Sequence, residues 1–280
     1  MRSKSPLPAP AGLFPTLMSD AVLQYIHHLR SFNLISDRPM SKHKKKKHKD
    51  ASGKKKMLPA QVEAVEWIGE HFRLVDILAE GCQGAKWQPG AKLNIDIGDG
   101  MTRTYTPIAI NAKSGRVRIL AYIHGQSPAS QWASAIAVGD NTYTSAPRSS
   151  LDLNELSSAV VFFGDETSLG AAKTLQLHLG SDFSACCIFE IRQPQQVEAV
   201  VERLELANIT LVQIREDRSH LGEIAHRLRR ALADLSTRHI VLTGNGRSIQ
   251  AVRAALQANN ATGIKYLVKA YWTPEKTLKD

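Results

Sequence analysis

The stretch "AVVFFGDETSLGAAKTLQLHLG", Ala159–Gly180, decides the fold class of this chain. It opens with five apolar residues, passes through a short polar loop and continues with apolar residues at helical spacing. Such a unit is typical of a buried strand followed by a helix that covers the sheet. The same alternation of strand and helix recurs as far as the last apolar run, "IKYLVKAYW" at Ile264–Trp272. We therefore expect a parallel α/β sheet with helices on both faces.

Upstream of this region the pattern is one of short strands without long helices. Four runs alternate apolar and polar residues: "FRLVDILAEG" (Phe72–Gly81), "AKLNIDIG" (Ala91–Gly98), "TRTYTPIAI" (Thr102–Ile110) and "RVRILAYIHG" (Arg116–Gly125). Turn sequences such as "QPG", "GDG" and "AKSG" separate them. This spacing predicts a small antiparallel barrel. A helix is expected next, with Ser127 as its N-cap, Pro128 at its first position and Gly139 as its stop.

Two strand ends in the α/β region carry glycine, in "FFGDETS" and "LTGNGRS". Ligands of open α/β sheets bind outside the carboxyl ends of the strands. Glycine lets the backbone approach a ligand closely, and a helix N-terminus attracts anions. Neither stretch matches a dinucleotide or P-loop fingerprint, however, so a nucleotide site and a plain tight turn both remain open.

A second candidate anion site lies in "HGQSPASQWA", His124–Ala133. A strand ends at His124 and a helix with free N–H donors follows, which suits a diphosphate. Arg103 and Tyr105 lie two positions apart in an extended segment, so both side chains share one face. An arginine there would supply the cation that a phosphate requires. The alternative readings are a surface cation for Arg103 and core aromatics for Tyr105 and Trp132.

The overall charge of the chain belongs mostly to one tract. The 280 residues carry a formal net charge of +10, and Lys42–Lys56 alone holds nine lysines and one aspartate. This tract is expected to be disordered, either as a solvated linker or as a weak polyanion contact. A proline-rich start and an amphipathic helix over Leu17–Phe32 are expected before it. The first 56 residues are therefore predicted to be an N-terminal extension.

The compartment follows from what the sequence does not contain. No apolar run reaches the length of about 20 residues that crosses a bilayer, and no signal peptide is recognisable at the start. Cys82, Cys186 and Cys187 have no metal-ligand spacing and are expected to be reduced thiols. The sequence thus predicts a cytoplasmic protein, without a metal site, that is a monomer.

The motifs occur in an order that resembles the siderophore-interacting protein family. These motifs are R-x-Y-T at Arg103, H-G-x-x-P-A-S-x-W-A at His124, A-P-R at Ala146, G-D-E-T-x-L at Gly164 and A-Y-W at Ala270. That family comprises flavin-dependent ferric-siderophore reductases of the ferredoxin–NADP reductase superfamily. The resemblance covers about residues 57–280. It implies a six-stranded antiparallel flavin-binding barrel over residues 57–150 and an NAD(P)H-binding α/β domain over residues 151–280.

The resemblance also implies roles for individual residues. Arg103 would pair with a flavin phosphate, Tyr105 would stack on the isoalloxazine and Thr106 would hydrogen-bond the ring edge. The remaining FAD and NAD(P)H contacts would come from His124, Ser127, Ala129, Ser130, Gly164, Asp165, Glu166 and Thr167. Lys92, Arg148 and Lys269 would bind the anionic ferric chelate. The alternative for Lys92 and Arg148 is ordinary surface charge, and for Glu166 a helix cap.

The function expected from the resemblance is reduction of a ferric siderophore. NADH or NADPH would reduce FAD, and the flavin would reduce the bound Fe(III) so that iron leaves as Fe(II). No catalytic side chain is expected, because the flavin carries the chemistry. The alternatives are a general flavin or quinone reductase and a non-catalytic protein that binds siderophores or a polyanion.

Overall fold

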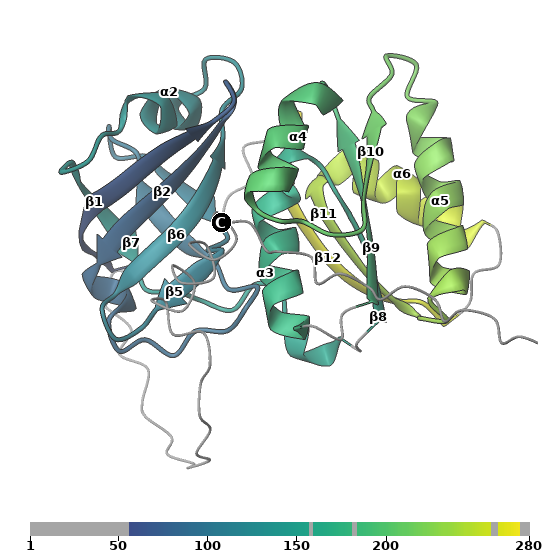
Figure 1. Ribbon diagram of the computed structural model, residues 1–280, viewed down its shortest axis with the longest axis horizontal. Coiled ribbons are helices and arrows are strands. Elements are labelled where there is room, and N and C mark those ends of the chain that lie inside the picture. The colour runs from purple at the N-terminus through teal and green to yellow at the C-terminus, as the bar shows by residue number, and fades with distance from the viewer. Residues whose placement is uncertain (1–55, 157–158, 181–183, 259–262, 275–280) are drawn as a thin grey trace, which may run out of the picture. The chain divides into compact units, whose positions relative to one another are not determined.

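The computed structural model describes residues 56–156, 159–180, 184–258 and 263–274 and contains two β-sheets (Figure 1). The first sheet consists of β1 (Met57–Ile68), β2 (Phe72–Ala79), β3 (Leu93–Asp96), β4 (Thr102–Tyr105), β5 (Ala109–Asn111), β6 (Arg116–Tyr122) and β7 (Asn141–Ser145). The helix α2 (Pro128–Ala135) lies between β6 and β7 in the sequence. The predictions for the N-terminal extension, including the helix over residues 17–32, lie outside the described residues.

The first sheet is antiparallel, with the strand order β4-β3-β7-β1-β2-β6-β5. Its apolar side chains alternate, so that Val75, Ile77 and Ile119 are fully buried on one face. The predicted antiparallel architecture is confirmed. The sheet has seven strands, however, and not the six that were expected, and β4 and β5 form its two ends.

The segment from Thr102 to Ile110, which reads as a single strand, is divided in the structure. β4 ends at Tyr105 and β5 begins at Ala109, with Pro107 between them. Proline has no N–H for a strand ladder, so it interrupts the pairing at this point. As a result β4 pairs with β3 while β5 pairs with β6, at opposite ends of the sheet.

The second sheet is parallel and has the strand order β10-β9-β8-β11-β12. Its strands are β8 (Ala159–Gly164), β9 (Ser184–Ile191), β10 (Ile209–Gln213), β11 (His239–Asn245) and β12 (Lys265–Trp272). The order reverses between β8 and β11, which makes this the switch point of a doubly wound sheet. The α/β prediction is confirmed.

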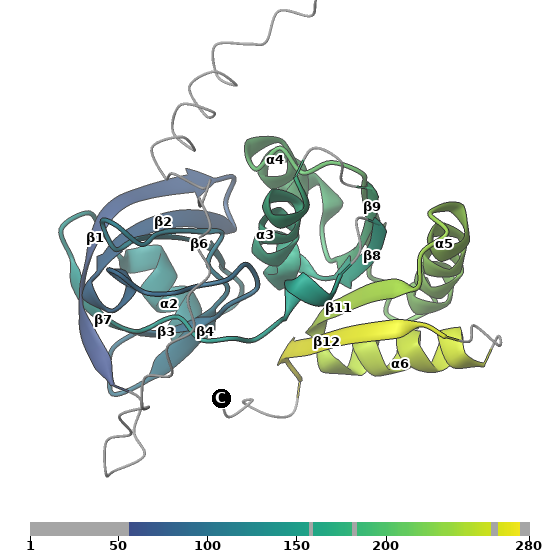
Figure 2. The ribbon, with the colours of Figure 1, turned by 90° about the horizontal axis from the view of Figure 1, so that it is seen from below.

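Helices cover both faces of the parallel sheet (Figure 2). They are α3 (Leu169–Leu179), α4 (Pro194–Arg203), α5 (His220–Asp234) and α6 (Gly246–Gln257). α3 and α4 share one apolar cluster with the sheet, and α5 and α6 share the cluster on its other face. Three short 3₁₀ turns complete the elements of the described ranges: η1 (Glu80–Cys82), η2 (Leu153–Glu155) and η3 (Glu166–Ser168).

The two sheets are joined through the α3 and α4 side. Phe72 and Leu74 of β2 and Ile108, which directly precedes β5, belong to the same buried cluster as Leu169 and Leu175 of α3. Thr174 Oγ1 donates to the Pro107 carbonyl at 3.0 Å. These contacts bring the gap between β4 and β5 against α3, which places the predicted flavin-binding strand next to the parallel sheet.

Three further expectations concern the chain as a whole. Cys82 and Cys187 are buried and Cys186 is half-buried, and all three are free thiols. Within the described ranges, no helix is long and apolar enough to cross a bilayer. β7 ends at Ser145 and β8 begins at Ala159, on either side of the boundary predicted between residues 150 and 151.

Candidate functional site

β4 presents Arg103 and Tyr105 on one face of the sheet, as the alternation predicts. Arg103 lies opposite Ile95, and Tyr105 lies opposite Leu93, on the antiparallel neighbour β3. The Tyr105 ring packs against the barrel core, with its centroid 6.0 Å from that of Trp132 in α2. Burial raises the pKa of the Tyr105 hydroxyl well above its ordinary value. Tyr105 and Trp132 thus pack as core aromatics, and only part of the Tyr105 ring remains exposed.

The loop between β6 and α2 is fixed by two serines. Ser127 caps α2, because its hydroxyl oxygen accepts the N–H of Ser130 at 3.2 Å, as predicted. The Ser130 hydroxyl donates to the His124 carbonyl at 2.8 Å and accepts the His124 N–H at 3.1 Å. Ser130 is also almost fully buried. Its side chain therefore shapes the loop, whereas Ala129, in the first turn of α2, keeps an N–H that no intrahelical bond uses.

His124 stands at the exposed end of a short aromatic stack. Its ring lies 5.1 Å from that of Tyr122, which in turn lies 4.9 Å from Phe72. Partial burial, followed by the positive charge of Arg192, lowers the pKa of His124 below its ordinary value. The imidazole is therefore neutral at neutral pH.

Arg192 is a site residue that the sequence analysis missed. It follows β9 directly, and its side chain is exposed. Its charge adds to the lowering of the pKa of His124 by burial and opposes the rise that burial causes in the pKa of Tyr122, so Arg192 lies close to the β6 end of the barrel. The backbone N–H of Arg192 also donates to Glu166 Oε1 at 2.7 Å. Nothing local in the sequence marks this arginine, because its position depends on the order of the strands.

Asp165 closes the switch point between β8 and β11. Its carboxylate accepts the Thr167 N–H at 2.9 Å, the Thr167 hydroxyl and the indole N–H of Trp272 at 2.8 Å. A further bond comes from the backbone of Asn245. Burial raises the pKa of Asp165, although these donors oppose the rise. Asp165 and Thr167 were predicted to contact a cofactor. In the structure, their side chains form hydrogen bonds within this turn and to Trp272.

Two glycines make room for this turn. Gly164 precedes Asp165, and a Cβ on it would lie 2.4 Å from the Cβ of Ser168. Gly244 has a φ of +94°, and a Cβ there would lie 2.5 Å from the Asp165 carboxyl carbon. Glu166 is buried and bonds the N–H of Arg192, so it links β8 to β9 and does not cap α3.

The end of β12 reaches the barrel. Pairing with β11 shifts between Gly244 and Asn245, so Tyr271 is an extra residue and forms a β-bulge. The Tyr271 hydroxyl lies 3.4 Å from Thr106 Oγ1, and burial raises its pKa to about 12. A residue predicted at the flavin ring edge thus meets the last strand of the parallel sheet.

The three residues predicted to bind the chelate do not lie together on one face. Lys92 and Arg148 form an isolated antiparallel bridge, with backbone bonds of 2.8 Å in both directions. Arg148 and Thr104 both donate to Asn94 Oδ1, so these side chains lie on the face opposite to Arg103 and Tyr105.

Lys269 lies elsewhere, on β12. Its neighbours Leu267 and Tyr271, two positions away on either side, both pack against the cluster shared with the barrel. Alternation therefore places Lys269 on the face that meets Thr106. Lys269 is thus the one candidate of the three on the strand of Tyr271, the residue that contacts Thr106.

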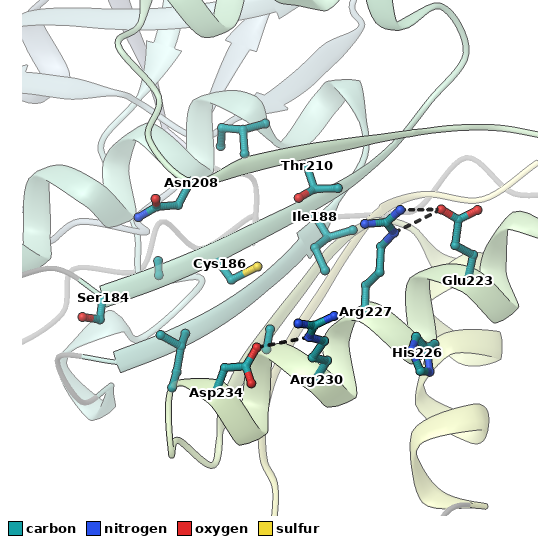
Figure 3. A pocket seen from close by; sticks show the side chains of 14 residues that line it. Ser184, Cys186, Ile188, Asn208, Thr210, Glu223, His226, Arg227, Arg230 and Asp234 are labelled. Atoms are coloured by element: carbon teal, nitrogen blue, oxygen red, sulfur yellow. Dashed lines mark hydrogen bonds and ion pairs between the residues drawn. The ribbon is translucent and has the colours of Figure 1, made fainter.

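A large groove lies away from all of these residues (Figure 3). It measures about 830 Å³ and runs between the β9–β10 edge of the parallel sheet and α5. Cys186, Ile188 and Thr210 point into it, while Arg227 pairs with Glu223 and Arg230 pairs with Asp234 on its wall. None of the predicted site residues lines this groove.

The residues at the barrel fit an anionic cofactor. The N–H of Ala129 points out of the first turn of α2, where the helix dipole favours a diphosphate. In the part of the chain that the structure describes, the only hydrogen bond of the Arg103 guanidinium is to the Thr102 carbonyl, at 3.0 Å. Its other donors are free for a phosphate. No cluster of metal-ligating side chains is found among the described residues.

Comparison with known families agrees with this arrangement. Residues 77–151 match the profile of the siderophore-interacting FAD-binding domain, and residues 157–275 match that of the siderophore-interacting protein. The first match covers β4 and the β6–α2 loop, and the second covers the switch point and β12. No curated protein sequence matches the chain.

Solved structures share the fold at low sequence identity. The siderophore-interacting protein from Acinetobacter baumannii is 17% identical, with a TM-score of 0.59 over 79% of this chain and 92% of that one. A point mutant of ferredoxin-NADP+ reductase from Plasmodium falciparum is 12% identical, with a TM-score of 0.58 over 77% and 96% of the two chains. Full-length CYP116B46 from Tepidiphilus thermophilus is 17% identical, with a TM-score of 0.60 over 77% of this chain, which spans 29% of that protein.

Proposed function

The chain belongs to the siderophore-interacting protein family, and from this premise we propose that it is an FAD-dependent, NAD(P)H-driven reductase of ferric siderophores. One observation carries the proposal. The contact between Thr106 and Tyr271 brings the end of β4 to the carboxyl edge of the parallel sheet. A flavin beside Thr106 would therefore lie next to the crevice in which α/β sheets bind nucleotides.

The barrel supplies the binding groups for FAD. Arg103 and the Ala129 N–H would hold the diphosphate, while Ser127 and Ser130 fix the loop that carries His124. His124 is neutral at neutral pH, so it adds no charge and presents a flat ring beside the cofactor. Thr106 offers its hydroxyl to the flavin ring edge. When bound, FAD accepts a hydride from NAD(P)H and delivers single electrons to an acceptor.

The parallel sheet supplies the binding groups for NAD(P)H. Four arginines lie at or just beyond the carboxyl ends of its strands, where a dinucleotide diphosphate would need cations: Arg192, Arg215, Arg218 and Arg247. Gly164 and Gly244 leave room for the side chains of Ser168 and Asp165, which shape the turn at the switch point. The hydrogen bond from the Trp272 indole to Asp165 fixes the position of this turn.

The acceptor is the ferric chelate, which is a substrate and not a resident metal. One NAD(P)H carries two electrons, so two Fe(III) chelates become Fe(II) chelates for each nucleotide oxidised. Fe(II) binds such chelators weakly, so reduction releases the iron. Lys269, on the face of β12 toward Thr106, is the residue that we assign to chelate attraction, because ferric siderophores are often anionic. Lys92 and Arg148 remain candidates for an outer part of this site.

The experiment that tests the proposal follows the absorption spectrum of the purified full chain after addition of FAD. Anaerobic NADPH or NADH is expected to bleach the flavin band, and a ferric chelate is expected to restore it while an Fe(II) indicator develops colour. The same reduced protein mixed with free flavin or quinone measures the rival activities. A chain that binds no FAD contradicts the proposal. Faster reoxidation by quinone than by every ferric chelate would favour a general reductase.

A second experiment tests the role of Lys269 in attracting the ferric chelate. Replacing Lys269 by Gln is expected to raise the KM for an anionic ferric chelate while leaving NAD(P)H-driven bleaching unchanged. Lys265, on the same strand and exposed, provides the matched control variant Lys265→Gln. An equal effect of both replacements would show that general surface charge, and not Lys269, attracts the chelate.

A further inference from the structure

A buried carboxylate and a buried histidine face one another beneath the carboxyl edge of the parallel sheet. Glu190 Oε2 lies 3.1 Å from His220 Nε2, and each side chain is only 3% exposed. Glu190 comes from β9, and His220 is the first residue of α5. Buried polar groups of this kind are costly unless every one finds a partner, so their presence needs a reason.

The hydrogen bonds fix the tautomer of His220. Its Nδ1 accepts the backbone N–H of Arg215 at 3.2 Å, and an accepting nitrogen carries no proton. The proton of the neutral ring is therefore on Nε2, which donates to Glu190. Burial, followed by the charges of Arg218 and Arg215, lowers the pKa of His220, which keeps this neutral form in place at neutral pH. The chain of bonds runs from Arg215 through His220 to Glu190.

Several charged and polar groups surround Glu190. Ser248 of α6 donates a side-chain hydrogen bond to it, Asp165 and Glu166 of the switch point repel its negative charge, and Arg218 attracts it. Burial is the largest influence, and it raises the pKa of Glu190 to about 7. Glu190 thus ties together β9, α5 and α6 immediately under the switch point.

The loop held by His220 carries two arginines. Residues Arg215 to Arg218 form a turn, closed by an Arg218 N–H to Arg215 carbonyl bond of 3.0 Å. Arg218 has a φ of 61°, which is uncommon for a residue other than glycine and persists only where the surroundings hold it. Asp217 Oδ1 also accepts the Ser219 N–H at 3.0 Å. The turn thus has a defined shape that depends on its anchors.

The turn lies at the same edge as the switch point. It follows β10, which is two strands from β8, or about 10 Å at normal strand spacing. A dinucleotide that starts at the switch point is long enough to reach it. Arg215 pairs with Glu223 on the exposed surface at 2.8 Å, whereas the Arg218 side chain is exposed and can meet a phosphate.

We propose that Glu190 and His220 are positioning residues, which hold the Arg215–Arg218 turn in the shape that receives a phosphate group of NAD(P)H. This inference rests on the proposed function. Neither residue touches the nucleotide. The pair acts through the Arg215 backbone, so its loss should weaken nucleotide binding and leave the flavin chemistry unaffected.

The test uses the full chain loaded with FAD. His220→Ala and His220→Asn are compared with the wild type in flavin difference spectra titrated with NADP+ and with NAD+. The asparagine can still accept the Arg215 N–H through its side-chain oxygen but cannot reach Glu190. Losing a buried hydrogen bond is expected to raise the Kd of the alanine variant roughly ten-fold, with a smaller rise for asparagine. His226→Asn, an exposed replacement on the same helix, should leave the Kd unchanged.

Two further readouts separate positioning from general damage. The rate of flavin reduction at saturating NAD(P)H and the reoxidation of photoreduced flavin by a ferric chelate should both stay within about two-fold of the wild type. An unchanged Kd in His220→Ala overturns the inference. If His220→Ala does not fold, an unchanged Kd in both His220→Asn and Glu190→Gln overturns it instead. A wild type that NAD(P)H does not reduce at all contradicts the proposed function and not the positioning pair alone.

The pH profile supplies a signature that a merely structural role would not produce. Above pH 7 Glu190 is a carboxylate and accepts the His220 proton fully, and below that pH it takes up a proton and holds His220 less firmly. The Kd for NAD+, which lacks the titrating 2′-phosphate, should therefore rise as the pH falls through about 7. Glu190→Gln should flatten this step, and a step that persists in the variant overturns the role of Glu190.

Discussion

Replacing Gly244 by alanine tests whether the switch point is as tightly built as the structure indicates. The new Cβ would lie 2.5 Å from both the carboxyl carbon and Oδ2 of Asp165. Asp165 cannot move away freely, because Trp272, Thr167 and the Asn245 backbone all hold its carboxylate. The substitution therefore combines a steric clash with backbone strain at a φ of +94°.

The magnitude follows from these two contributions. A non-glycine residue in a left-handed conformation costs about 1–2 kcal/mol. Overpacking a rigid site costs about 1–3 kcal/mol more. Gly139 isolates the first contribution, because its φ is +93° and nothing lies within 4 Å of a Cβ built on it. We expect Gly244→Ala to lower the free energy of unfolding by about 2–5 kcal/mol and Gly139→Ala by about 1–2 kcal/mol.

The assay is urea unfolding of the full chain without cofactor, followed by circular dichroism and by tryptophan fluorescence. Trp272 lies at the switch point, so its emission should change first in Gly244→Ala. Equal destabilisation by the two alanine variants would refute the reasoning, since it would mean that the carboxylate of Asp165 moves aside at no cost.

Three other predictions concern the site and the barrel. Arg192→Gln should raise the pKa of His124, because the charge of Arg192 now lowers it; an NMR titration of the imidazole checks this, and an unchanged pKa would place Arg192 too far away to act. Thr106→Val should slow flavin reduction at saturating NAD(P)H about ten-fold without changing the Kd of NADP+, as measured by stopped flow; a raised Kd with an unchanged rate would contradict a role at the flavin ring edge. Asp76→Asn should lower the free energy of unfolding by about 3–5 kcal/mol, because Asp76 and Arg118 form a buried bidentate pair with bonds of 2.7 Å and the variant removes its negative charge. Arg203→Met breaks the exposed pair with Glu66 and should lower it by less than about 1 kcal/mol in the same urea assay.

The sequence predicts the parallel sheet well because its strands are buried on both faces. Runs such as "AVVFF" and "IVL" are apolar throughout, and each is followed by a helix with clear spacing. Two strands of the first sheet were not recognised. β1 carries a register shift between Val62 and Ala64, which breaks its alternation, and β7 reads "NTYTS", with no aliphatic residue. Both strands were therefore missing from the expected barrel.

The candidate site could be predicted only where its residues are neighbours in sequence. Arg103 and Tyr105 share a face, and Ser127 caps α2, because both relations span two or three residues. The role of Asp165 depends on Trp272, 107 positions further on, and on a glycine in β11. The local sequence therefore identified Asp165 as a candidate site residue. It did not show that the Asp165 carboxylate accepts its hydrogen bonds from the protein itself.

The pairing of Asp165 with Trp272 has a consequence for the order in which the protein is made. Asp165 follows the first strand of the parallel sheet, and Trp272 ends the last one. A nascent chain that has not yet released β12 from the ribosome carries the acidic turn without its indole donor, and Thr106 without Tyr271. The hydrogen bonds that complete the switch point and join it to the barrel must therefore wait for the last strand, and a translation product cut short before β12 would lack both of them.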